Sequence, residues 1–331
     1  MPSRLATVVA LYPAAIAILL VLHLVAPQRN GLLALTQIFA PHLGATVILF
    51  VPLAIVRPSR SLRLAVALAL AVTVLRFAPG AVSLPPPPTG RNAATITILS
   101  WNLEEGGPAT ATMLDVLRST DADVVALQEL TPRHAGAIEA DEELIARFPY
   151  RILVPEPYVS GIGLLSRWPI TASDADTDPI LIEAQVTLPE AGTLTIIDAH
   201  PFHADIQTAT PFRIPIGYDA TARDIDLASI RQRIDAGLEQ HRRLVLVGDL
   251  NLTEREPAFD DLSAGPWDAH RVVGLGLGST WRPTRLEFLP FGVLRIDHVL
   301  GSPDTRPLAI HVDCSPRASD HCIVTATVAI E

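Results

Sequence analysis

Several polar side chains stand where short apolar runs of the sequence end, and their types suit metal binding and proton transfer. Glu129 follows the run DVVAL closely, His200 follows TLTIIDA, and Asp249 follows RLVLVG. The full set is Asn102, Glu104, Glu129, His200, Asp249, Asn251, Asp297, Asp320 and His321. A single carboxylate after an apolar run is usually a surface residue or a helix cap, so only the whole set indicates a site.

Together these residue types match the needs of phosphoester hydrolysis. A hard divalent cation such as Mg²⁺ or Mn²⁺ takes oxygen ligands, which Asn102, Glu129 and Asp320 can supply. Displacement at phosphorus spreads negative charge over the non-bridging oxygens, where a cation, an imidazolium and an amide stabilise it. An aspartate can take the proton of an attacking water, and a histidine held charged by a carboxylate can act as the acid.

The elements that must position these side chains alternate between strands and helices. The β-branched runs 95–101, 123–127, 193–198, 243–247, 294–300 and 323–330 predict strands. Longer stretches at 110–119, 132–148 and 221–241 predict helices. The sequence therefore predicts an α/β domain whose polar residues gather at strand ends.

Seven motifs in this order resemble the endonuclease/exonuclease/phosphatase superfamily. They are SWN at 100–102, QE at 128–129, GIGLLSR at 161–167, DAH at 198–200, GDLN at 248–251, RIDHVL at 295–300 and SDH at 319–321. The similarity extends over about residues 95–330. It implies a four-layer α/β sandwich, in which two mixed sheets lie face to face between helices, with one metal-dependent site at an edge.

The resemblance also implies where the metal binds. Asn102, Glu104 and Glu129 match metal-site positions of the superfamily, and Asp320 matches a residue that assists the metal. The cofactor implied is Mg²⁺ or Mn²⁺.

The same resemblance assigns the catalytic roles. Asp249 would align and deprotonate the attacking water, and Asn251 would hydrogen-bond a phosphate oxygen. Asp297 would orient His321, which would stabilise charge on the phosphoryl group. His200 would help to protonate the leaving oxygen, although its Ala-His-Pro context differs from the usual Thr-His-Leu and its acidic partner cannot be identified from the sequence.

Two arginines near the motifs have two interpretations. Arg167 and Arg295 could contact phosphate bidentately, or could form salt bridges within a domain rich in carboxylates. The two are equally favoured for Arg295, and the salt bridge is favoured for Arg167.

The first 90 residues have the composition of a membrane anchor. They contain six arginines and no Asp, Glu or Lys, with uncharged stretches of 24 and 27 residues. At about 1.5 Å per residue each stretch can cross a bilayer core of about 30 Å. We predict an anchor at 1–80 with about three helices (5–26, 31–56 and 62–80), a proline-rich linker at 81–91 and a catalytic domain at 92–331. His23 and His42, inside these spans, could mark an ion path or pack against a neighbouring helix.

Loop charges predict a multi-pass protein of the cell membrane with its catalytic domain outside the cytoplasm. The loop 57–63 carries three arginines and the loop near Arg29 carries one. Because positive charge favours the cytoplasmic side, we expect loop 57–63 to be cytoplasmic and the loop near Arg29 to lie outside. Cys314 and Cys322 flank the SDH motif, and in an oxidising compartment they could form a disulfide that stiffens this loop.

Charge also bears on the substrate. Residues 91–331 contain 19 basic and 35 acidic residues, a net charge of −16 that disfavours nucleic acid as a partner. The apolar segment 201–220 after His200 could be a lid, a lip that contacts lipid, or packed surface. We favour a phosphodiesterase or phosphatase that acts on a lipid headgroup or small phosphoester beside the bilayer, and predict no protein partner. The alternatives are a metal-dependent nuclease and an inactive, membrane-anchored binding protein.

Overall fold

The computed structural model describes residues 4–57, 59–81, 93–105, 107, 109–189, 191–209, 214–283, 286, 288–315 and 318–331. Contacts divide the chain into two units. The helical unit contains residues 1–82, 204–221 and 255–257, and the sandwich unit contains residues 83–203, 222–254 and 258–331. The sequence places 204–221 and 255–257 in the catalytic domain, so their membership of the helical unit is a difference from the prediction.

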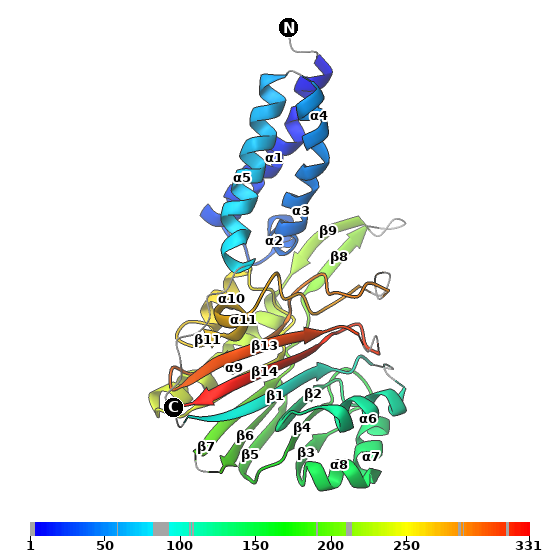
Figure 1. Ribbon diagram of the computed structural model, residues 1–331, viewed down its shortest axis with the longest axis vertical. Helices are drawn as coiled ribbons and strands as arrows, with labels where there is room; N and C mark the ends of the chain where they lie inside the picture. The colour runs from blue at the N-terminus through cyan, green and yellow to red at the C-terminus, as the bar shows by residue number, and fades with distance from the viewer. Residues whose placement is uncertain are drawn as a thin grey trace. The chain divides into compact units, whose positions relative to one another are not determined.

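The sandwich unit contains two six-stranded mixed sheets (Figure 1). The first has the order β13 (Thr305–Asp313), β14 (Ile323–Ile330), β1 (Ala94–Asn102), β2 (Val124–Gln128), β4 (Ile162–Ser166) and β3 (Tyr150–Val154). The second has the order β11 (Trp267–Asp268), β12 (Asp297–Gly301), β10 (Leu244–Asp249), β7 (Gly192–Ala199), β6 (Ile180–Leu188) and β5 (Ile170–Thr177). β1 is parallel to β2 and β7 is parallel to β10, while the other neighbours are antiparallel.

Three apolar clusters hold the layers together. One cluster fills the space between the sheets with side chains such as Ile98, Val124, Ile196 and Val247. A second packs the outer face of the first sheet against α6 (Thr110–Ser119), α7 (Pro132–Ala140) and α8 (Glu142–Arg147). A third packs the second sheet against α9 (Thr221–Glu239) and α10 (Pro257–Leu262), and the short α11 (Ala269–Val273) follows β11. The four-layer α/β sandwich is therefore confirmed.

The predicted helix 132–148 is in fact two helices, because Asp141 interrupts it. The Asp141 carboxylate accepts a hydrogen bond from the backbone N–H of Leu144 (3.0 Å), and so caps a new helix at that point. The same carboxylate pairs with Arg118 of α6. An aspartate in a helical pattern can be a cap as readily as a surface residue, and the sequence periodicity does not distinguish the two.

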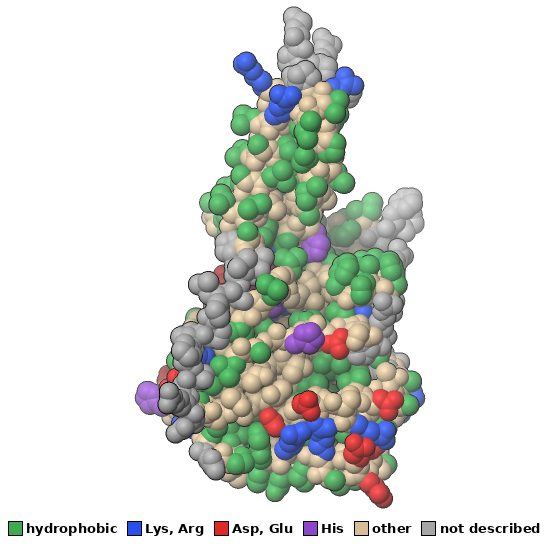
Figure 2. Space-filling view, viewed as in Figure 1, with side chains coloured by type: hydrophobic (Ala, Val, Ile, Leu, Met, Phe, Trp, Pro, Cys, Tyr) green, Lys and Arg blue, Asp and Glu red, His purple; other side chains and the backbone are tan. Residues whose placement is uncertain are grey.

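The helical unit contains two helices that are long and apolar enough to cross a membrane, in α1 (Arg4–Val25) and α5 (Arg60–Ala81). A third candidate is bent by 73° and consists of α2 (Gly31–Ile38), α3 (Ala40–Thr46), the 3₁₀ turn η1 (Val47–Phe50) and α4 (Val51–Val56). The bend follows Phe39, where Pro41 enters the first turn of α3 and cannot donate a backbone hydrogen bond. Apolar side chains cover these helices (Figure 2).

α5 covers the predicted helix 62–80 and extends one or two residues beyond it at each end. It continues through Pro79 and Gly80 to Ala81, since a proline in the last turn removes only one hydrogen bond from the helix. The remainder of the predicted linker lies outside the described residues. The unit also includes a hairpin of β8 (Asp205–Ala209) and β9 (Ile214–Asp219), and β9 contacts α2.

Cys314 and Cys322 form a disulfide, with 4.3 Å between their Cα atoms. It joins β13 and β14 one residue beyond the last paired positions, Asp313 and Ile323. The bond therefore closes the loop that carries Asp320 and His321.

We expect protein purified without reductant to contain no free thiol. Alkylation under denaturing conditions followed by intact-mass analysis should show no modified cysteine before reduction and two after it. Two alkylated cysteines before reduction would refute the disulfide.

Candidate active site

The predicted site residues lie at one edge of the inter-sheet core because they continue its inward-facing positions. Side chains alternate between the two faces of a strand, so residues two apart share a face. Ile98 of β1 packs between the sheets, and Asn102 lies four positions further on the same face. Val247 and Asp249 of β10 have the same relation. His200, directly after β7, continues that strand's inward series.

Strand direction brings these ends to one edge. The carboxyl ends of the parallel pairs β1 with β2 and β7 with β10 each share an edge, and the two sheets contact each other through β1 and β10. β12 runs antiparallel to β10, so its first residue, Asp297, pairs with Asp249. His321 precedes β14 and forms a backbone bridge with Trp281.

Asp249 is the centre of the cluster. Its Oδ2 accepts a hydrogen bond from Asn102 Nδ2 at 3.0 Å. The same oxygen lies 3.5 Å from His321 Nε2 and 3.6 Å from His200 Nε2. Asn102 Nδ2 also donates to Glu129 Oε1 at 3.1 Å, so one amide holds the two carboxylates together. Residues separated by up to 219 positions therefore converge.

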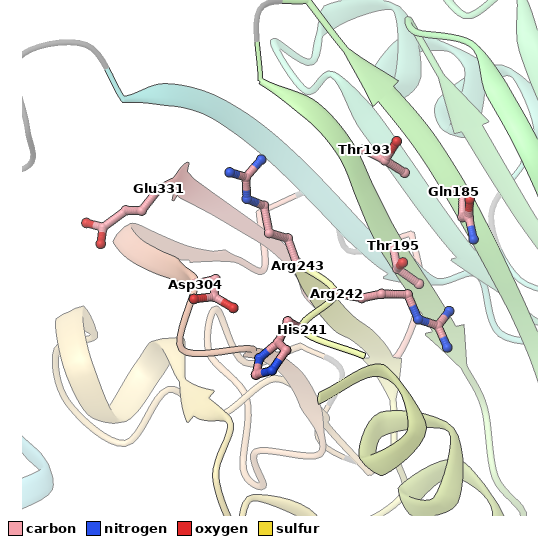
Figure 3. Close-up of a pocket in the computed structure, with 8 residues that line it drawn as sticks. All are labelled: Gln185, Thr193, Thr195, His241, Arg242, Arg243, Asp304 and Glu331. Carbon is pink, nitrogen blue, oxygen red and sulfur yellow. The ribbon is translucent and has the colours of Figure 1, made fainter. Parts of the chain in front are cut away.

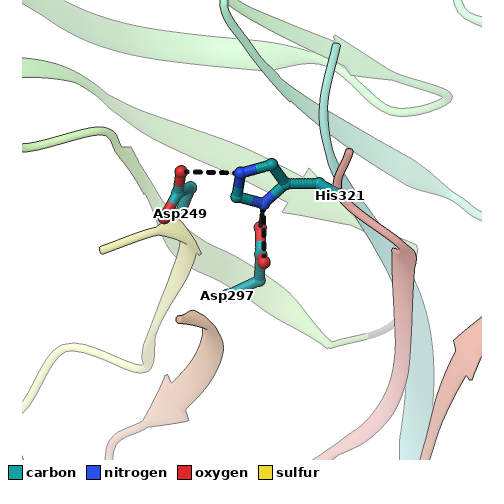
Figure 4. A group of neighbouring side chains, drawn as sticks. All are labelled: Asp249, Asp297 and His321. Atoms are coloured by element: carbon teal, nitrogen blue, oxygen red, sulfur yellow. Dashed lines mark hydrogen bonds and ion pairs between the residues drawn. The ribbon is translucent and has the colours of Figure 1, made fainter. Parts of the chain in front are cut away.

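His321 lies between two buried carboxylates (Figure 4). Its Nδ1 is 2.9 Å from Asp297 Oδ2 and 3.1 Å from Asp297 Oδ1, while Nε2 faces Asp249. Burial alone would lower the pKa of His321, but Asp297 and Asp249 outweigh burial and raise this pKa to about 10. The ring is a buried imidazolium at neutral pH.

The partner of His200 is a backbone group, which explains why no acidic partner is visible in the sequence. His200 Nδ1 is 3.1 Å from the carbonyl oxygen of Val159. Because a carbonyl only accepts, Nδ1 carries a hydrogen and Nε2 points toward Asp249 and Glu129, which lie 3.6 and 3.8 Å away. The carbonyl fixes the orientation of the ring as a carboxylate would, without adding charge.

Carboxylates crowd the rest of the site. The backbone N–H of Asp320 donates to Glu104 Oε2 at 3.1 Å, and Trp281 Nε1 donates to Asp320 Oδ2 at 2.8 Å. Burial raises the pKa of Asp320, and the nearby charges of Glu129 and Asp249 raise it further. Such a concentration of oxygen donors and negative charge fits a divalent cation such as Mg²⁺ or Mn²⁺.

The side chains of the site form two groups that differ in how well they could bind a metal ion. Asp249, Asp297 and His321 offer donor atoms within 4.8 Å of one another, a spacing that a metal could use. However, both ring nitrogens of His321 already face carboxylates, so this trio is better described as an ion-paired cluster. Glu129, Asp320 and their neighbours Glu104 and Asn102 supply the oxygen ligands that a hard cation prefers.

Backbone strain is concentrated at the same edge. Glu104, Glu129 and Asn251 have positive φ values of 58°, 55° and 49°, a conformation that residues other than glycine rarely adopt. Gly248 has a φ of 138°, and a Cβ there would lie 2.2 Å from the carbonyl oxygen of Ala199. Only glycine therefore allows β10 to approach β7 closely enough to place Asp249 beside His200.

Asn251 lies beside Asp249, and its amide is partly engaged. Its backbone N–H donates to Asp249 Oδ1 at 2.9 Å, and its Nδ2 donates to the carbonyl oxygen of Pro201 at 3.0 Å. The second hydrogen of Nδ2 has no partner among the described residues.

A buried polar layer beneath the site was not predicted from the sequence. Gln128 Nε2 donates to Asp198 Oδ1 at 2.6 Å and lies 3.3 Å from Ser100 Oγ. Burial raises the pKa of Asp198 far above its ordinary value, because a charged carboxylate is poorly solvated at this position. The sequence does contain a signal for this layer, because Asp198 follows Leu194 and Ile196 in the inward-facing series of β7.

Arg295 forms a salt bridge, which decides between its two interpretations. Its Nη1 and Nη2 donate to the two oxygens of Asp268 at 2.9 and 2.8 Å, and both side chains are buried. Arg167 pairs with Asp123 at 3.2 Å. These contacts give both arginines structural partners.

Asp268→Asn is expected to lower the free energy of unfolding by about 3–5 kcal/mol, because it leaves the buried Arg295 charge with only the longer contact to Glu254, at 3.4 Å. Thermal unfolding of the full chain in detergent, followed by tryptophan fluorescence, measures the change. Asp235→Asn, at an exposed position of α9, is the matched control. Equal stability of Asp268→Asn and the wild type would contradict the prediction.

The same pair predicts a dependence of stability on pH. Burial opposes ionisation of Asp268, but the charge and hydrogen bonds of Arg295 outweigh burial and lower the pKa from 3.8 to about 2. A depressed pKa stabilises the fold above the unfolded-state value, and this contribution, about 2 kcal/mol, is lost as the pH falls from about 4 toward 2. Asp268→Asn should lack this component of acid destabilisation in the same unfolding measurement.

A separate pocket of about 530 Å³ lies at the other ends of β7 and β10 (Figure 3). Its arginines are engaged: Arg242 pairs with Glu183 at 2.8 Å, and Arg243 donates to the carbonyl oxygen of Ala191. The lining residues are Gln185, Thr193, Thr195, His241, Arg242, Arg243, Asp304 and Glu331. The pocket shares no residue with the site described above.

A family model described as "Endonuclease/Exonuclease/phosphatase family" matches residues 99–321 of the chain. A comparison with curated proteins found no match to this chain.

Solved structures show the same fold at low sequence identity. A 3′ phosphatase, NExo, from Neisseria bound to a product DNA hairpin has 20% identity and a TM-score of 0.56, covering 70% of this chain and 98% of that one. TDP2 of D. rerio in complex with a single-strand DNA product has 19% identity and a TM-score of 0.52, covering 71% and 99%. A protein from Bacteroides vulgatus has 15% identity and a TM-score of 0.56, covering 72% and 100%.

Proposed function

This chain belongs to the endonuclease/exonuclease/phosphatase family of phosphoester hydrolases, and we propose that it is a membrane-anchored, divalent-metal-dependent member. The observation that carries the proposal is the convergence of Glu129, Asp249 and His321. The Asn102 amide donates to both Glu129 and Asp249, and Asp249 in turn lies 3.5 Å from His321. Each role in the reaction, namely metal ligand, general base and general acid, has a residue of a suitable type. This argues against an inactive binding protein.

Glu129, Glu104, Asp320 and Asn102 would hold the cation. Their oxygen donors fit Mg²⁺ or Mn²⁺, and several carboxylates near one another need a positive charge between them. When bound, the cation would stabilise negative charge on the phosphoryl oxygens.

The other side chains would divide the work of proton transfer and charge stabilisation. Asp249 Oδ2 would accept a proton from the attacking water. The protonated Nε2 of His321 would donate a hydrogen bond to a phosphoryl oxygen, while Asp297 keeps Nδ1 protonated. The free hydrogen of the Asn251 amide would contact a second oxygen. With both ring nitrogens protonated, His200 would give the Nε2 proton to the leaving oxygen, while Nδ1–H stays on the carbonyl oxygen of Val159.

We favour a lipid headgroup or small phosphoester as the substrate. The net charge of −16 over residues 91–331 disfavours a polyanion. The hairpin of β8 and β9 belongs to the same unit as the apolar helices and exposes Ile206, Ile214 and Ile216, by 46%, 57% and 55%. An exposed apolar hairpin beside membrane-type helices suits contact with lipid.

Nuclease activity remains the second candidate, because two of the similar structures contain DNA. Their likeness to this chain lies in the fold, and the acid and base proposed for this chain would serve either substrate.

We further propose a multi-pass protein with the sandwich outside the cytoplasm. The arginines of the segment 57–63 support this orientation through the positive-inside rule. The disulfide supports it independently, because disulfides persist in oxidising compartments.

A substrate panel tests the proposal. The purified full chain should hydrolyse bis-p-nitrophenyl phosphate and phospholipid in mixed micelles with Mg²⁺, and a chelator should abolish both activities. Hydrolysis of plasmid DNA alone would establish the nuclease alternative. Absence of activity on every substrate with either metal would overturn the assignment of a hydrolase.

A further inference from the structure

The pocket at the ends of β7 and β10 opposite the candidate active site is lined by polar groups. Its eight described lining residues are two threonines, a glutamine, a histidine, two arginines and two acids, and its volume is about 530 Å³. Cavities that bind small organic molecules are usually lined by apolar and aromatic side chains. Because this lining has no aliphatic side chain and no Phe, Tyr or Trp ring for stacking, it suits a strongly hydrated ligand with charged groups and hydroxyls. All eight residues belong to the sandwich unit.

The pocket forms where the second sheet continues past the end of a helix. α9 covers the outer face of this sheet and packs on Ile197 of β7, but it ends at Glu239. Thr195 and Thr193 lie two and four positions before Ile197 on the same face. Gln185 of β6 pairs with Thr195. These three polar side chains form the floor of the pocket beyond the helix end.

Thr195 is the most buried residue of this floor, and its hydroxyl is unused. The residue is 3% exposed, and its backbone N–H donates to the carbonyl oxygen of Arg243 at 2.9 Å. The side-chain hydroxyl has no hydrogen-bond partner among the described residues, and neither has the side-chain amide of Gln185. Buried polar groups are normally hydrogen-bonded, because an unpaired group loses its bonds to water without replacement. A ligand in the pocket would supply the missing partners.

Two arginines line the pocket beside the floor, and each is held by a single nitrogen. Arg242 Nη1 donates to Glu183 Oε1 at 2.8 Å, and Arg243 Nη1 donates to the carbonyl oxygen of Ala191 at 2.6 Å. Glu183 balances the charge of Arg242, whereas the described part of the chain places no carboxylate within ion-pair distance of Arg243. The two guanidinium groups point in different directions (Figure 3). Arg243 therefore offers Nε and Nη2 to one oxyanion, in the paired geometry that guanidinium groups use for phosphates and carboxylates.

The turn that presents both arginines has a strained backbone. The Arg242 N–H donates to the carbonyl oxygen of Gly237 at 2.8 Å, and the His241 N–H donates to that of Leu238 at 3.0 Å. These are the two hydrogen bonds of a Schellman motif, whose left-handed position is usually a glycine. Here that position is His241, with a φ of 52° and its side chain exposed on the pocket lining. Strain of this kind is concentrated at functional sites.

The opposite side of the pocket is acidic (Figure 3). The Glu331 carboxylate pairs with Arg306. The Asp304 carboxylate has no partner among the residues that the structure describes, while the Asp304 carbonyl oxygen accepts a hydrogen bond from the Glu331 N–H at 3.2 Å. An unpaired carboxylate accepts hydrogen bonds from hydroxyl groups and repels a second anion. The pocket therefore favours a ligand with one anionic group and several hydroxyls over a polyanion.

We infer that this pocket binds a polyhydroxylated molecule with one oxyanion, the chemistry that sugar phosphates and sugar acids share. The oxyanion lies against Nε and Nη2 of Arg243. The hydroxyl groups bind Thr195 and Gln185 on the floor and Asp304 on the acidic side. The volume of about 530 Å³ lies within the range of small-molecule sites. This site is separate from the hydrolytic site and does not depend on the proposed function.

Isothermal titration calorimetry of the full chain in detergent tests the inference, with a chelator present so that the hydrolytic site holds no cation. The probes are glucose 6-phosphate and gluconate, and the controls are glucose and inorganic phosphate, which each represent one half of the ligand. We expect at least one probe to bind about tenfold more tightly than either control, the effect of one charged hydrogen bond. Tighter binding of glucose 6-phosphate identifies the anion as a phosphate, and tighter binding of gluconate identifies it as a carboxylate.

Arg243→Gln should weaken binding of the preferred probe about tenfold. Arg151→Gln is the matched control, because Arg151 of β3 also donates from Nη1 to a backbone carbonyl, at 2.7 Å. Thr195→Val keeps the shape and strand preference of the side chain, and its loss of the hydroxyl should weaken binding about fivefold. Its control is Thr187→Val, on the same face of the sheet but outside the pocket lining. Both controls should bind as the wild type does.

Arg243→Lys guards against an effect of misfolding, because it keeps the charge and should retain part of the affinity that Arg243→Gln loses. Absence of binding by both probes, or equal binding of glucose, would overturn the site. Equal binding of inorganic phosphate would overturn it as an adventitious ion only. Equal weakening by Arg243→Gln and Arg151→Gln would also overturn it, and loss of binding in Asp249→Asn would do so by placing the ligand at the hydrolytic site. Weaker binding in Arg243→Gln with unchanged turnover of bis-p-nitrophenyl phosphate would support it, and that turnover separately reports the proposed function.

Discussion

The Asp249→Asn variant is expected to lose about 10²- to 10⁴-fold in turnover of bis-p-nitrophenyl phosphate, the range typical for removal of a general base. An amide cannot take a proton from water. The change also removes one of the two carboxylates that face His321 and alters the oxygen shared with Asn102. Steady-state kinetics of the full chain with Mg²⁺ measures the loss.

Asp235→Asn is the control for this variant. Asp235 is an exposed carboxylate on α9 that pairs with Arg231 one helical turn away, so its loss should leave turnover within about twofold of the wild type. Thermal unfolding of Asp249→Asn should confirm that the fold is kept. Turnover by Asp249→Asn within a factor of about three of the wild type would rule out Asp249 as the base.

The second large effect is expected at His321. Replacing it by glutamine removes a buried imidazolium, and we expect turnover to fall by about 10²- to 10⁴-fold. Asp297→Asn should lower turnover by a smaller factor, because the His321 ring remains and loses only the carboxylate that lies 2.9 Å from Nδ1.

A double variant shows whether the two residues act as a unit. If Asp297 acts only through His321, His321→Gln combined with Asp297→Asn should be no slower than His321→Gln alone. Additive losses would instead give Asp297 an independent role, such as binding metal in the cluster of Asp249, Asp297 and His321.

The convergence of the site could be predicted from the sequence because strands have a period of two residues. Asn102 and Asp249 continue the inward series of Ile98 and Val247, and a reader of the sequence can count this. The layered architecture follows from the same pattern, together with the order of the seven motifs. What the sequence lacks is any measure of which strand ends meet, and the resemblance to a known superfamily supplied that.

The remaining features depend on partners that have no sequence signal. Val159 holds His200 through a backbone carbonyl, which any residue could provide. Asp268, the partner of Arg295, lies 27 residues away in a two-residue strand. Residues 204–221 belong to the helical unit through contacts between distant parts of the sequence. One of them is the 2.7 Å hydrogen bond from the Ala220 N–H to Asn30 Oδ1. Local patterns report periodicity and capping, and they carry no information about such pairs.

The position of a bound metal would show whether the carboxylates around Glu129 form the catalytic metal site. We propose a crystal of the protein soaked with Mn²⁺ and an anomalous difference map recorded near the manganese absorption edge. We expect one strong peak beside the carboxylate of Glu129, within the group that includes Glu104 and Asp320. A peak between Asp249, Asp297 and His321, or no peak near any of these carboxylates, would contradict it.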